Sequence, residues 1–353
     1  MRIGAISDIH LDVNIDYPVI EAIGSYSKAS NLEMLLVAGD ISNSYKTTLS
    51  YLDQLEAAVE IPVCFVPGNH DMWDKEGEIK DARKIYEMYE KRSGCLCQKE
   101  IKLNKDWAVI GAIGWYDYSF GDLAYSNEAF EKREKNERIW QDRIMVHWHE
   151  SDQQFHKRML TDLEEKLLAC EGKNVIAVTH MIGIPEFKVP QSRPDWDYFN
   201  AFLGSREYGE LFEKHHVSYH FMGHVHYRKQ LLKNGVDYRC VCLNYHTEWK
   251  SSNLAKEVAD AMQIIEGSIP VLTPVNIAGL VILGVVNTGI AYYLWFRGIE
   301  ILSPVRVSLL SPVNPLTAFL LGFVVLGQRI SFIQIVGVAV IIASIFVSQR
   351  KTA

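Results

Sequence analysis

The sequence lacks the usual signals of a structural zinc protein, a redox protein or a secreted protein. It has six cysteines but no C-x-x-C spacing, which is the common spacing of zinc and redox sites. We interpret the two C-x-C pairs, Cys95/Cys97 and Cys240/Cys242, as reduced thiols, and we expect the second pair to face one side of a strand. A strand pattern begins within two residues of Met1, so we expect no secretory signal.

Positive charge is also scarce. The chain of 353 residues has a formal net charge of −7. From Ile269 onward, five Lys or Arg face one Glu, a net charge of +4 that leaves −11 for the preceding residues. An acidic N-terminal part argues against strong nonspecific binding to nucleic acid, because the phosphate backbone attracts positive surfaces. The length and the hydrophobic content of 48% favour two units.

Polar side chains stand at the ends of five short apolar strand patterns within the first 226 residues. These side chains are Asp8, His10, Asp40, Asn69, His70, Asp71, His180, His224 and His226. Open α/β sheets place their chemistry at the C-terminal ends of strands. Carboxylate, amide and imidazole ligands without thiolate suit Mn²⁺, Fe or Zn²⁺. One histidine at a strand end is more often structural, so the prediction of a metal site depends on the whole set.

The ordered motifs resemble those of the calcineurin-like metallophosphoesterase superfamily. They are Asp8-x-His10, Gly39-Asp40, Gly68-Asn69-His70-Asp71, His180 and Gly223-His224-x-His226. The resemblance covers roughly residues 1 to 250 and implies an α/β sandwich of two sheets flanked by helices, with two divalent metal ions. The implied ligands are Asp8, His10 and His226 for one ion, Asn69, His180 and His224 for the other, and Asp40 as the bridge.

The same resemblance implies hydrolysis of a phosphomonoester or a phosphodiester by metal-activated hydroxide, with Mn²⁺ preferred over Fe or Zn²⁺. Two ions can clamp the attacking and leaving oxygens at phosphorus. His70 would protonate or stabilise the leaving alkoxide, and Asp71 would orient His70. Asn43 stands where the commonest motif has an aspartate, and we expect it to act as a hydrogen-bonding group. The alternative that the chain is a family member that keeps the metal ligands but has lost catalytic turnover also stays open.

Two aromatic segments interrupt the alternation of strands and helices in the first 250 residues. Residues 119 to 158 are charged and aromatic, and we interpret them as a cap-like insertion over the site. Within it, His147 and His149 imitate a metal pair, but residues at i and i+2 face apart on a helix. The loop at residues 187 to 210 could bind an apolar or nucleobase part of a substrate, or merely pack. A hairpin with an Asn-Gly turn at Asn234 closes the domain.

The composition changes after residue 250. Residues 247 to 268 are polar and acidic, and we interpret residues 251 to 270 as a linker or a short helix. Residues 271 to 353 contain three uncharged stretches of 22, 21 and 18 residues, and a membrane-spanning helix needs about 20. We therefore predict transmembrane helices at Val275–Phe296, Val307–Gly327 and Ile330–Val347. Motifs such as Pro312-Val-Asn-Pro315 resemble the last three helices of drug/metabolite transporter (EamA-like) proteins, which is less than one repeat of that fold.

The membrane orientation predicted from charge conflicts with the thiols. Arg297, Arg306 and Arg350 favour placing the first loop and the C-terminus inside, which would leave the N-terminal domain outside. Inverted insertion, a span that fails to cross, and a fused fragment without a transport role all stay open. We favour a membrane-associated protein whose catalytic domain is cytoplasmic and acts on a phosphate-ester substrate. The alternatives are a membrane transport or anchoring protein with a regulatory phosphoesterase-like domain, and a nuclease.

Overall fold

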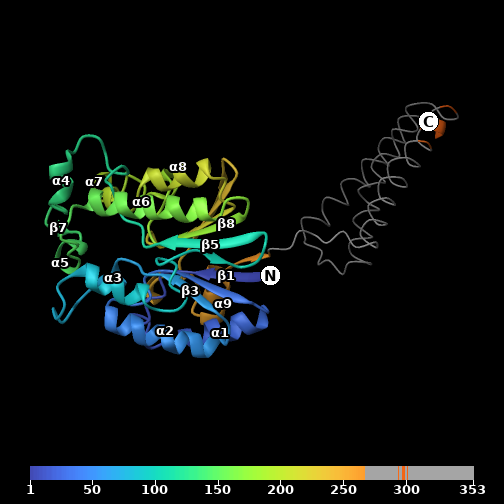
Figure 1. Cartoon of the computed structure of the whole chain (residues 1–353), viewed down its shortest axis with the longest axis horizontal. Helices are drawn as coiled ribbons and strands as arrows, with labels where there is room; N and C mark the ends of the chain where they lie inside the picture. Colours follow the sequence, from blue (N-terminus) through green and yellow to red (C-terminus); the bar gives the residue numbers. More distant parts are fainter. Residues whose placement is uncertain (267–292, 294–295, 299, 301–353) are drawn as a thin grey trace, which may run out of the picture. The chain divides into compact units, whose positions relative to one another are not determined.

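The computed structural model describes residues 1–266, 293, 296–298 and 300 (Figure 1). The chain divides into two units, Met1–Ser268 and Ile269–Ala353. Apart from Tyr293 and Phe296, the three predicted membrane helices lie outside the described residues. No helix within the described ranges is long and apolar enough to span a bilayer.

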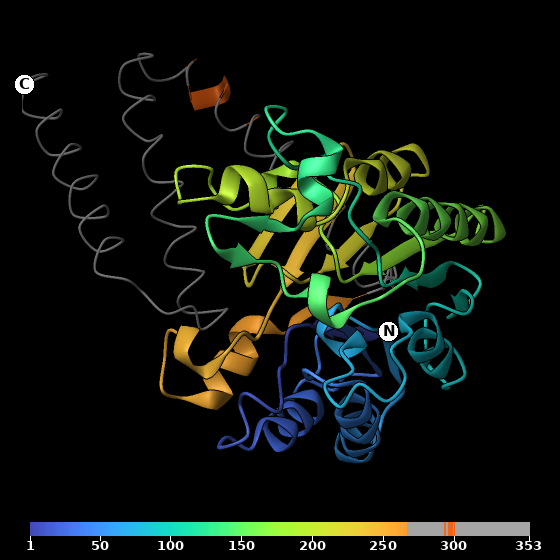
Figure 2. The same cartoon turned by 90° about the vertical axis from the view of Figure 1, so that its left-hand side faces the viewer.

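Two mixed sheets form the framework of the first unit (Figures 1 and 2). The first has the order β12-β1-β2-β3, from Gln263–Glu266, Arg2–Ile6, Met34–Ala38 and Val63–Val66. The second has the order β10-β11-β9-β8-β5-β4, from Arg228–Lys233, Val236–Val241, Tyr219–Met222, Asn174–Thr179, Trp107–Ala112 and Ile101–Lys102. β1, β2 and β3 are parallel, as are β5, β8, β9 and β11, so their C-terminal ends gather on one edge of each sheet.

Helices cover the outer face of each sheet, as the sequence predicts (Figure 1). The first sheet carries α1 (Val19–Ala29), α2 (Tyr45–Val59) and α9 (Leu254–Ala261), with α3 (Ala82–Glu90) beside them. The second carries α6 (Asp152–Ala169) and α8 (Arg206–Lys214). The inner faces pack together through buried side chains such as Val66 of β3, whose Cγ1 would lie 2.7 Å from a Cβ atom built on Gly111 of β5. The prediction of a two-sheet α/β sandwich is therefore confirmed.

The stretch expected to be a linker is built into the first sheet. Within residues 251–270, α9 packs on α1, and β12 pairs antiparallel with β1, Gln263 opposite Ala5. Val258, Met262 and Ile265 are buried. The stretch has three acids, Glu257, Asp260 and Glu266, and even Glu257 is buried, paired with Arg228. Residues 254–266 are therefore a structural part of the first unit rather than a linker.

The predicted insertion contains short elements and then the start of a core helix. Its elements are α4 (Asn127–Glu131), the hairpin β6–β7 (Glu134–Lys135 and Arg138–Ile139) and α5 (Asp142–Met145). The last seven residues assigned to the insertion lie in α6, which begins at Asp152, where Ser151 and Gln154 form a capping box. Phe155 of this helix is buried against Trp148, with ring centroids 3.8 Å apart. Residues 152–158 thus belong to the sandwich, and we call residues 119–151 the cap.

The remaining short helices are α7 (Trp196–Phe199) and the 3-10 turns η1 (His70–Met72), η2 (Pro185–Phe187), η3 (Asn200–Phe202) and η4 (His246–Glu248). In the aromatic loop, Tyr198, Phe199 and Phe202 are buried, so these three side chains pack rather than line an open site. All six cysteines are free and buried, as expected of reduced thiols. The sulfur atoms of Cys240 and Cys242 lie 3.5 Å apart on one side of the strand end.

Candidate metal centre

The predicted ligands converge at the edge where the parallel strands end. In Figure 1, β1 runs from the N-terminus toward the side occupied by α4, β7 and α5 of the cap. Three overlapping clusters form there, each with one ligand atom per residue and all atoms of a cluster within 4.8 Å of one another. They are Asp8, His10 and His226, which we call the first cluster; Asp40, His180 and His224, which we call the second cluster; and His10, Asp40 and His70, which overlaps both. The first and second clusters correspond to the two groups of residues that the sequence motifs predicted, except for Asn69.

Asn69 joins the second cluster through its side-chain oxygen. His180 Nε2 lies 3.1 Å from Asn69 Oδ1, 3.2 Å from Asp40 Oδ2 and 3.2 Å from His224 Nδ1. Four nitrogen or oxygen atoms therefore face one another around one small space. Such a convergence of electron-rich atoms, from a carboxylate, an amide and two imidazoles, fits a divalent cation of the Mn²⁺, Fe or Zn²⁺ type.

Hydrogen bonds fix the tautomers of three histidines. His180 Nδ1 lies 2.9 Å from the carbonyl of Ala38, and His224 Nε2 lies 3.2 Å from the carbonyl of Phe202. His226 Nδ1 lies 2.6 Å from Glu248 Oε2. Carbonyl and carboxylate oxygens only accept, so each of these ring nitrogens carries a proton, and the opposite nitrogen of a neutral ring keeps its lone pair. Histidines that bind metals are usually held in this way.

His10 gives the clearest sign of a missing partner in the first cluster. It is fully buried, and neither ring nitrogen has a hydrogen-bond partner among the described residues. Its Nε2 lies 4.0 Å from Asp8 Oδ1 and 3.9 Å from Asp40 Oδ2. An unpaired buried nitrogen is costly, by about 1–3 kcal/mol. A cation between His10 and the two carboxylates would remove that cost, so the residues of this cluster also fit a metal ion.

Burial keeps His10 and His224 neutral, whereas the charge of Asp40 draws a proton to His180. Burial lowers the pKa of His10 and of His224 well below the usual value, which keeps both rings neutral. Burial acts in the same direction on His180, but the carboxylate of Asp40 outweighs it and raises the pKa of His180 to about 10. The negative charge that attracts a proton to His180 would attract a metal ion to the same place.

The backbone is strained where most of the predicted ligands lie. Five of them have a left-handed conformation that side chains other than glycine rarely adopt. Their φ angles are 50° for Asp8, 44° for His10, 53° for Asp40, 71° for His224 and 54° for His226. Such strain costs of order 1–3 kcal/mol per residue and gathers at functional sites. The surrounding strands hold these five residues in positions that an isolated chain would avoid.

Two glycines let the loops approach the carboxylates. A Cβ atom at Gly68 would lie 2.1 Å from Asp40 Oδ1, and one at Gly223 would lie 2.2 Å from Asp8 Oδ2. Both distances are shorter than any van der Waals contact. The glycines that precede Asn69 and His224 in the motifs are therefore required by space at the metal centre.

The structure corrects the expected partner of His70. Its Nδ1 lies 2.6 Å from Asn43 Oδ1, and its ring stacks on Trp73 with centroids 4.0 Å apart. Asp71 does not orient His70. In the turn η1 its carboxylate points elsewhere and accepts the N–H groups of three loop residues and one hydroxyl, those of Ile41, Ser42, Gly68 and Thr48. Asp71 thus fastens the loop after β2 to the loop after β3.

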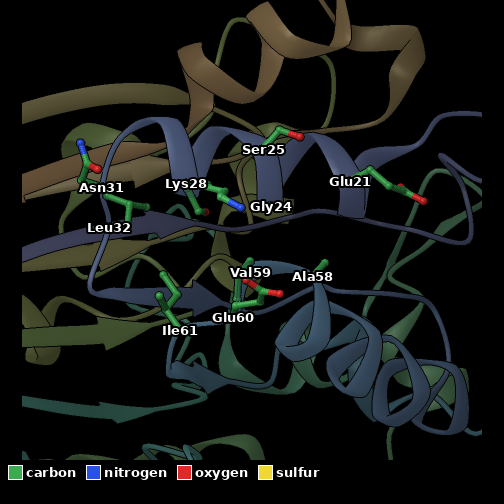
Figure 3. Close-up of a pocket in the computed structure, with 11 residues that line it drawn as sticks. Glu21, Gly24, Ser25, Lys28, Asn31, Leu32, Ala58, Val59, Glu60 and Ile61 are labelled. Carbon is green, nitrogen blue, oxygen red and sulfur yellow. The ribbon is translucent and has the colours of Figure 1, made fainter.

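Two carboxylates at the site were not among the predicted residues. Glu248 in η4 holds His226, and Asp142 in the cap accepts from Asn69 Nδ2 at 2.9 Å. His149 of the cap is exposed, and neither it nor His147 belongs to a metal-like cluster of the described residues. A cavity of about 650 Å³ between α1 and the end of α2, lined by Glu21, Lys28 and Glu60 among others, contains no predicted ligand (Figure 3).

Comparison with known families agrees with this geometry. A model of the calcineurin-like phosphoesterase family matches residues 1–228. The chain belongs to this family, whose members are hydrolases that act on ester bonds. A model of the EamA-like transporter family matches residues 261–349, so the chain also carries a C-terminal EamA-like segment. Both resemblances seen in the sequence are confirmed.

Individual relatives match only parts of the chain. Protein PecM of Dickeya dadantii is 39% identical over 89 residues, which are 25% of this chain and 30% of PecM. A probable cyclic nucleotide phosphodiesterase of Fibrobacter succinogenes is 29% identical over 93 residues, 23% of this chain and 36% of that protein. The chain thus spans about a third of the length of the curated relatives it matches.

A solved structure shows the same fold. The phosphopantetheinyl hydrolase of Mycobacterium tuberculosis superimposes with a TM-score of 0.60 and is 18% identical; the match covers 77% of this chain and 98% of that one. At this identity the likeness supports the α/β metallophosphoesterase fold and nothing finer.

Proposed function

We propose that this chain hydrolyses a phosphate ester at a dinuclear metal centre. One ion would be held by Asp8, His10 and His226, the other by Asn69, His180 and His224, with Asp40 bridging them. The observation that carries the proposal is the convergence of Asn69 Oδ1, Asp40 Oδ2 and His224 Nδ1 on His180 Nε2, all within 3.2 Å. The family match supports it.

The ligands would hold the metal ions, and His70 would act on the leaving group. Two bound divalent ions, with Mn²⁺ as our first choice and Fe or Zn²⁺ as alternatives, would polarise the phosphoryl group and activate water. His70 donates its Nδ1 proton to Asn43, so its Nε2 is the nitrogen left to face the substrate. Nε2 lies 3.9 Å from Asp40 Oδ2, at the edge of the centre. From there a protonated His70 can deliver a proton to the leaving alkoxide.

The family implies a phosphoester substrate, either a monoester or a diester. The name of the Fibrobacter relative makes a phosphodiester the first class to test. The net charge of −11 before Ile269 does not favour a nucleic acid, since no overall positive field would attract one.

The EamA-like segment implies association with a membrane. We propose that residues 271 to 353 anchor the chain through the three predicted helices, and that the catalytic domain is cytoplasmic. The match to the EamA-like transporter family favours a second candidate, a transport or anchoring protein in which the phosphoesterase domain is regulatory. Three helices are too few for the two repeats between which transporters of this kind place their path, so we rank this candidate second.

The test is hydrolysis by the full-length chain. Chromogenic 4-nitrophenyl phosphate and bis(4-nitrophenyl) phosphate would be offered with Mn²⁺, after chelation, and after Mn²⁺ is restored, beside the Asp40→Ala variant. We expect turnover that chelation stops, that Mn²⁺ restores and that the variant lacks. A folded, metal-loaded chain without turnover would contradict the hydrolase. Solute uptake that is indifferent to Asp40→Ala would favour the second candidate.

A further inference from the structure

A buried aspartate of the cap touches the metal centre. Asp142 is the first residue of α5 and is fully buried. Its Oδ1 accepts from Asn69 Nδ2 at 2.9 Å and from Trp73 Nε1 at 3.3 Å. Its Oδ2 accepts from Trp140 Nε1 at 2.9 Å, with the hydroxyl of Tyr116 at 3.5 Å. The two tryptophans and the tyrosine fix the carboxylate in place, so its position does not depend on Asn69.

This carboxylate decides which way the Asn69 amide faces. A carboxylate can only accept hydrogen bonds, so the NH₂ group of Asn69 must point toward Asp142. The oxygen of the amide then points the other way, toward His180 Nε2 at 3.1 Å. The terminal torsion of an asparagine has a broad, roughly two-fold preference. Without Asp142, the amide could turn and present hydrogen atoms, which repel a cation, to the second cluster.

The same part of the cap reaches another member of the second cluster. The ring of Trp140 lies edge-on to the ring of His224, with centroids 5.7 Å apart. Residues 140 and 142 therefore contact both Asn69 and His224, which belong to the same predicted ion. The hydrogen bond between Asp142 and Asn69 joins segments 73 residues apart in the sequence, so it forms only when the cap packs on the sandwich.

We propose that Asp142 is a positioning residue of the metal centre, and that the cap thereby completes the site of the second ion. Asp142 acts through Asn69 and does not itself bind the ion. The proposal rests on the proposed function, because it assigns Asn69 as a ligand. It predicts that loss of Asp142 weakens one of two ions and leaves the other bound.

The test measures Mn²⁺ binding to the full-length chain by calorimetry. Outer partners of metal ligands typically contribute about 10- to 100-fold in metal affinity. We expect Asp142→Ala to weaken one of the two Mn²⁺ ions by about that factor, and Asp142→Asn to weaken it less, since an amide oxygen can still accept from Asn69. The matched control is Asp152→Ala. Asp152 is a buried carboxylate nearby that also accepts from a tryptophan, Trp115 Nε1 at 2.7 Å, but holds no predicted ligand.

Exchanging the amide of Asn69 and the carboxylate of Asp142 separates a positioning role from an effect on stability. In Asn69→Asp alone, two carboxylates would face each other, and we expect the second ion to bind weakly. Adding Asp142→Asn would supply an NH₂ donor to the new carboxylate while an oxygen still accepts from Trp140, and the longer bond from Trp73 Nε1 at 3.3 Å would be lost. We expect the double variant to bind the second ion at least about tenfold more tightly than Asn69→Asp alone, which is a typical contribution of such a partner.

Several outcomes would overturn the proposal. They are wild-type affinity for both ions in Asp142→Ala, an equal loss in Asp152→Ala, and no recovery in the double variant. Failure of the proposed function looks different. A wild-type chain that binds two ions but hydrolyses no ester contradicts the hydrolase, while the binding comparison still decides the role of Asp142.

Discussion

The two sheets supply different chemistry to the metal centre. The loops after the first sheet provide Asp8, His10, Asp40 and Asn69, which include both carboxylates and the amide. The loops after the second sheet provide only imidazoles, those of His180, His224 and His226. Each cluster draws on both sheets, so neither sheet can form a site alone. The packing of the two sheets is therefore what brings the candidate ligands together.

The sheets also meet directly beside the first ligands. The N–H of Ser7, at the end of β1, donates to the carbonyl of Val241 at 2.9 Å, and its carbonyl accepts from Leu243 N–H at 2.8 Å. The next residue is Asp8, whose N–H donates to the carbonyl of Gly39 at 2.9 Å. Backbone hydrogen bonds thus register the two sheets at the point where the carboxylates must meet the imidazoles.

The largest effect is expected where the loops of the two sheets approach a carboxylate. Gly68→Ala would push on Asp40, and Gly223→Ala would push on Asp8, because each new Cβ would lie closer than 2.3 Å to a carboxylate oxygen. We expect Gly68→Ala to lose both ions, since Asp40 serves both, and Gly223→Ala to lose chiefly the ion of the first cluster. Metal catalysis contributes several kcal/mol, so kcat/KM should fall by at least about 10³-fold in each.

The measurement is metal content per chain together with kcat/KM. Gly172→Ala is the control, because no atom lies within 4 Å of the new Cβ, while its left-handed backbone (φ 79°) adds a strain that Gly68 and Gly223 do not have. We expect the control to lower thermal stability while both ions stay bound. Two ions per chain in Gly68→Ala would show that the close approach to Asp40 is not needed.

The next largest effect is expected on kcat when His70, which follows the first sheet and is not a predicted metal ligand, is replaced. We expect His70→Ala to keep both ions and to lower kcat by about 10²- to 10⁴-fold, as loss of a general acid does. The defect should be larger for alkyl phosphate esters than for 4-nitrophenyl esters, because a poor leaving group depends more on protonation. A defect that is equal for both kinds of ester would argue against proton donation by His70.

A smaller effect is expected for the carboxylate that supports an imidazole of the second sheet. Glu248 holds His226 Nδ1 at 2.6 Å. We expect Glu248→Ala to weaken Mn²⁺ binding in the first cluster by about 10- to 100-fold. Glu186→Ala is the matched control, since Glu186 has similar exposure but pairs with Lys233 at 2.9 Å, away from any predicted ligand. Equal Mn²⁺ affinities in the two variants would show that Glu248 does not support metal binding.

The sequence predicted the parts of the site that lie next to strands. Asp8, Asp40 and His180 follow buried apolar runs, so their place at the sheet edge could be expected before folding was known. Asp142 and Glu248 could not be found in this way. Their contacts to Asn69 and His226 span 73 and 22 residues and arise only from tertiary packing. Nothing in the local sequence separates these two acids from the exposed acids around them.

Adjacency in sequence was misleading in two places. Asp71 follows His70, yet the turn η1 directs its carboxylate to the N–H groups of neighbouring loops. Residues 247–268 contain several acids, which favours a linker or a short helix, yet Val258, Met262 and Ile265 are buried on the sandwich. Composition averages over a segment, whereas packing depends on the few positions that face inward.

The smallest effect is expected at the position that departs from the commonest motif. Asn43 holds His70 Nδ1 at 2.6 Å, and a hydrogen bond of this kind contributes about 0.5–1.5 kcal/mol. We therefore expect Asn43→Ala to lower kcat by up to about tenfold and to leave both ions bound, because Trp73 still stacks on the His70 ring at 4.0 Å. In the double variant with His70→Ala, the substitution should have no further effect on kcat. A further loss there would mean that Asn43 acts on the substrate or the ions directly, and the first sheet would then supply one more group to the reaction than its ligands and His70.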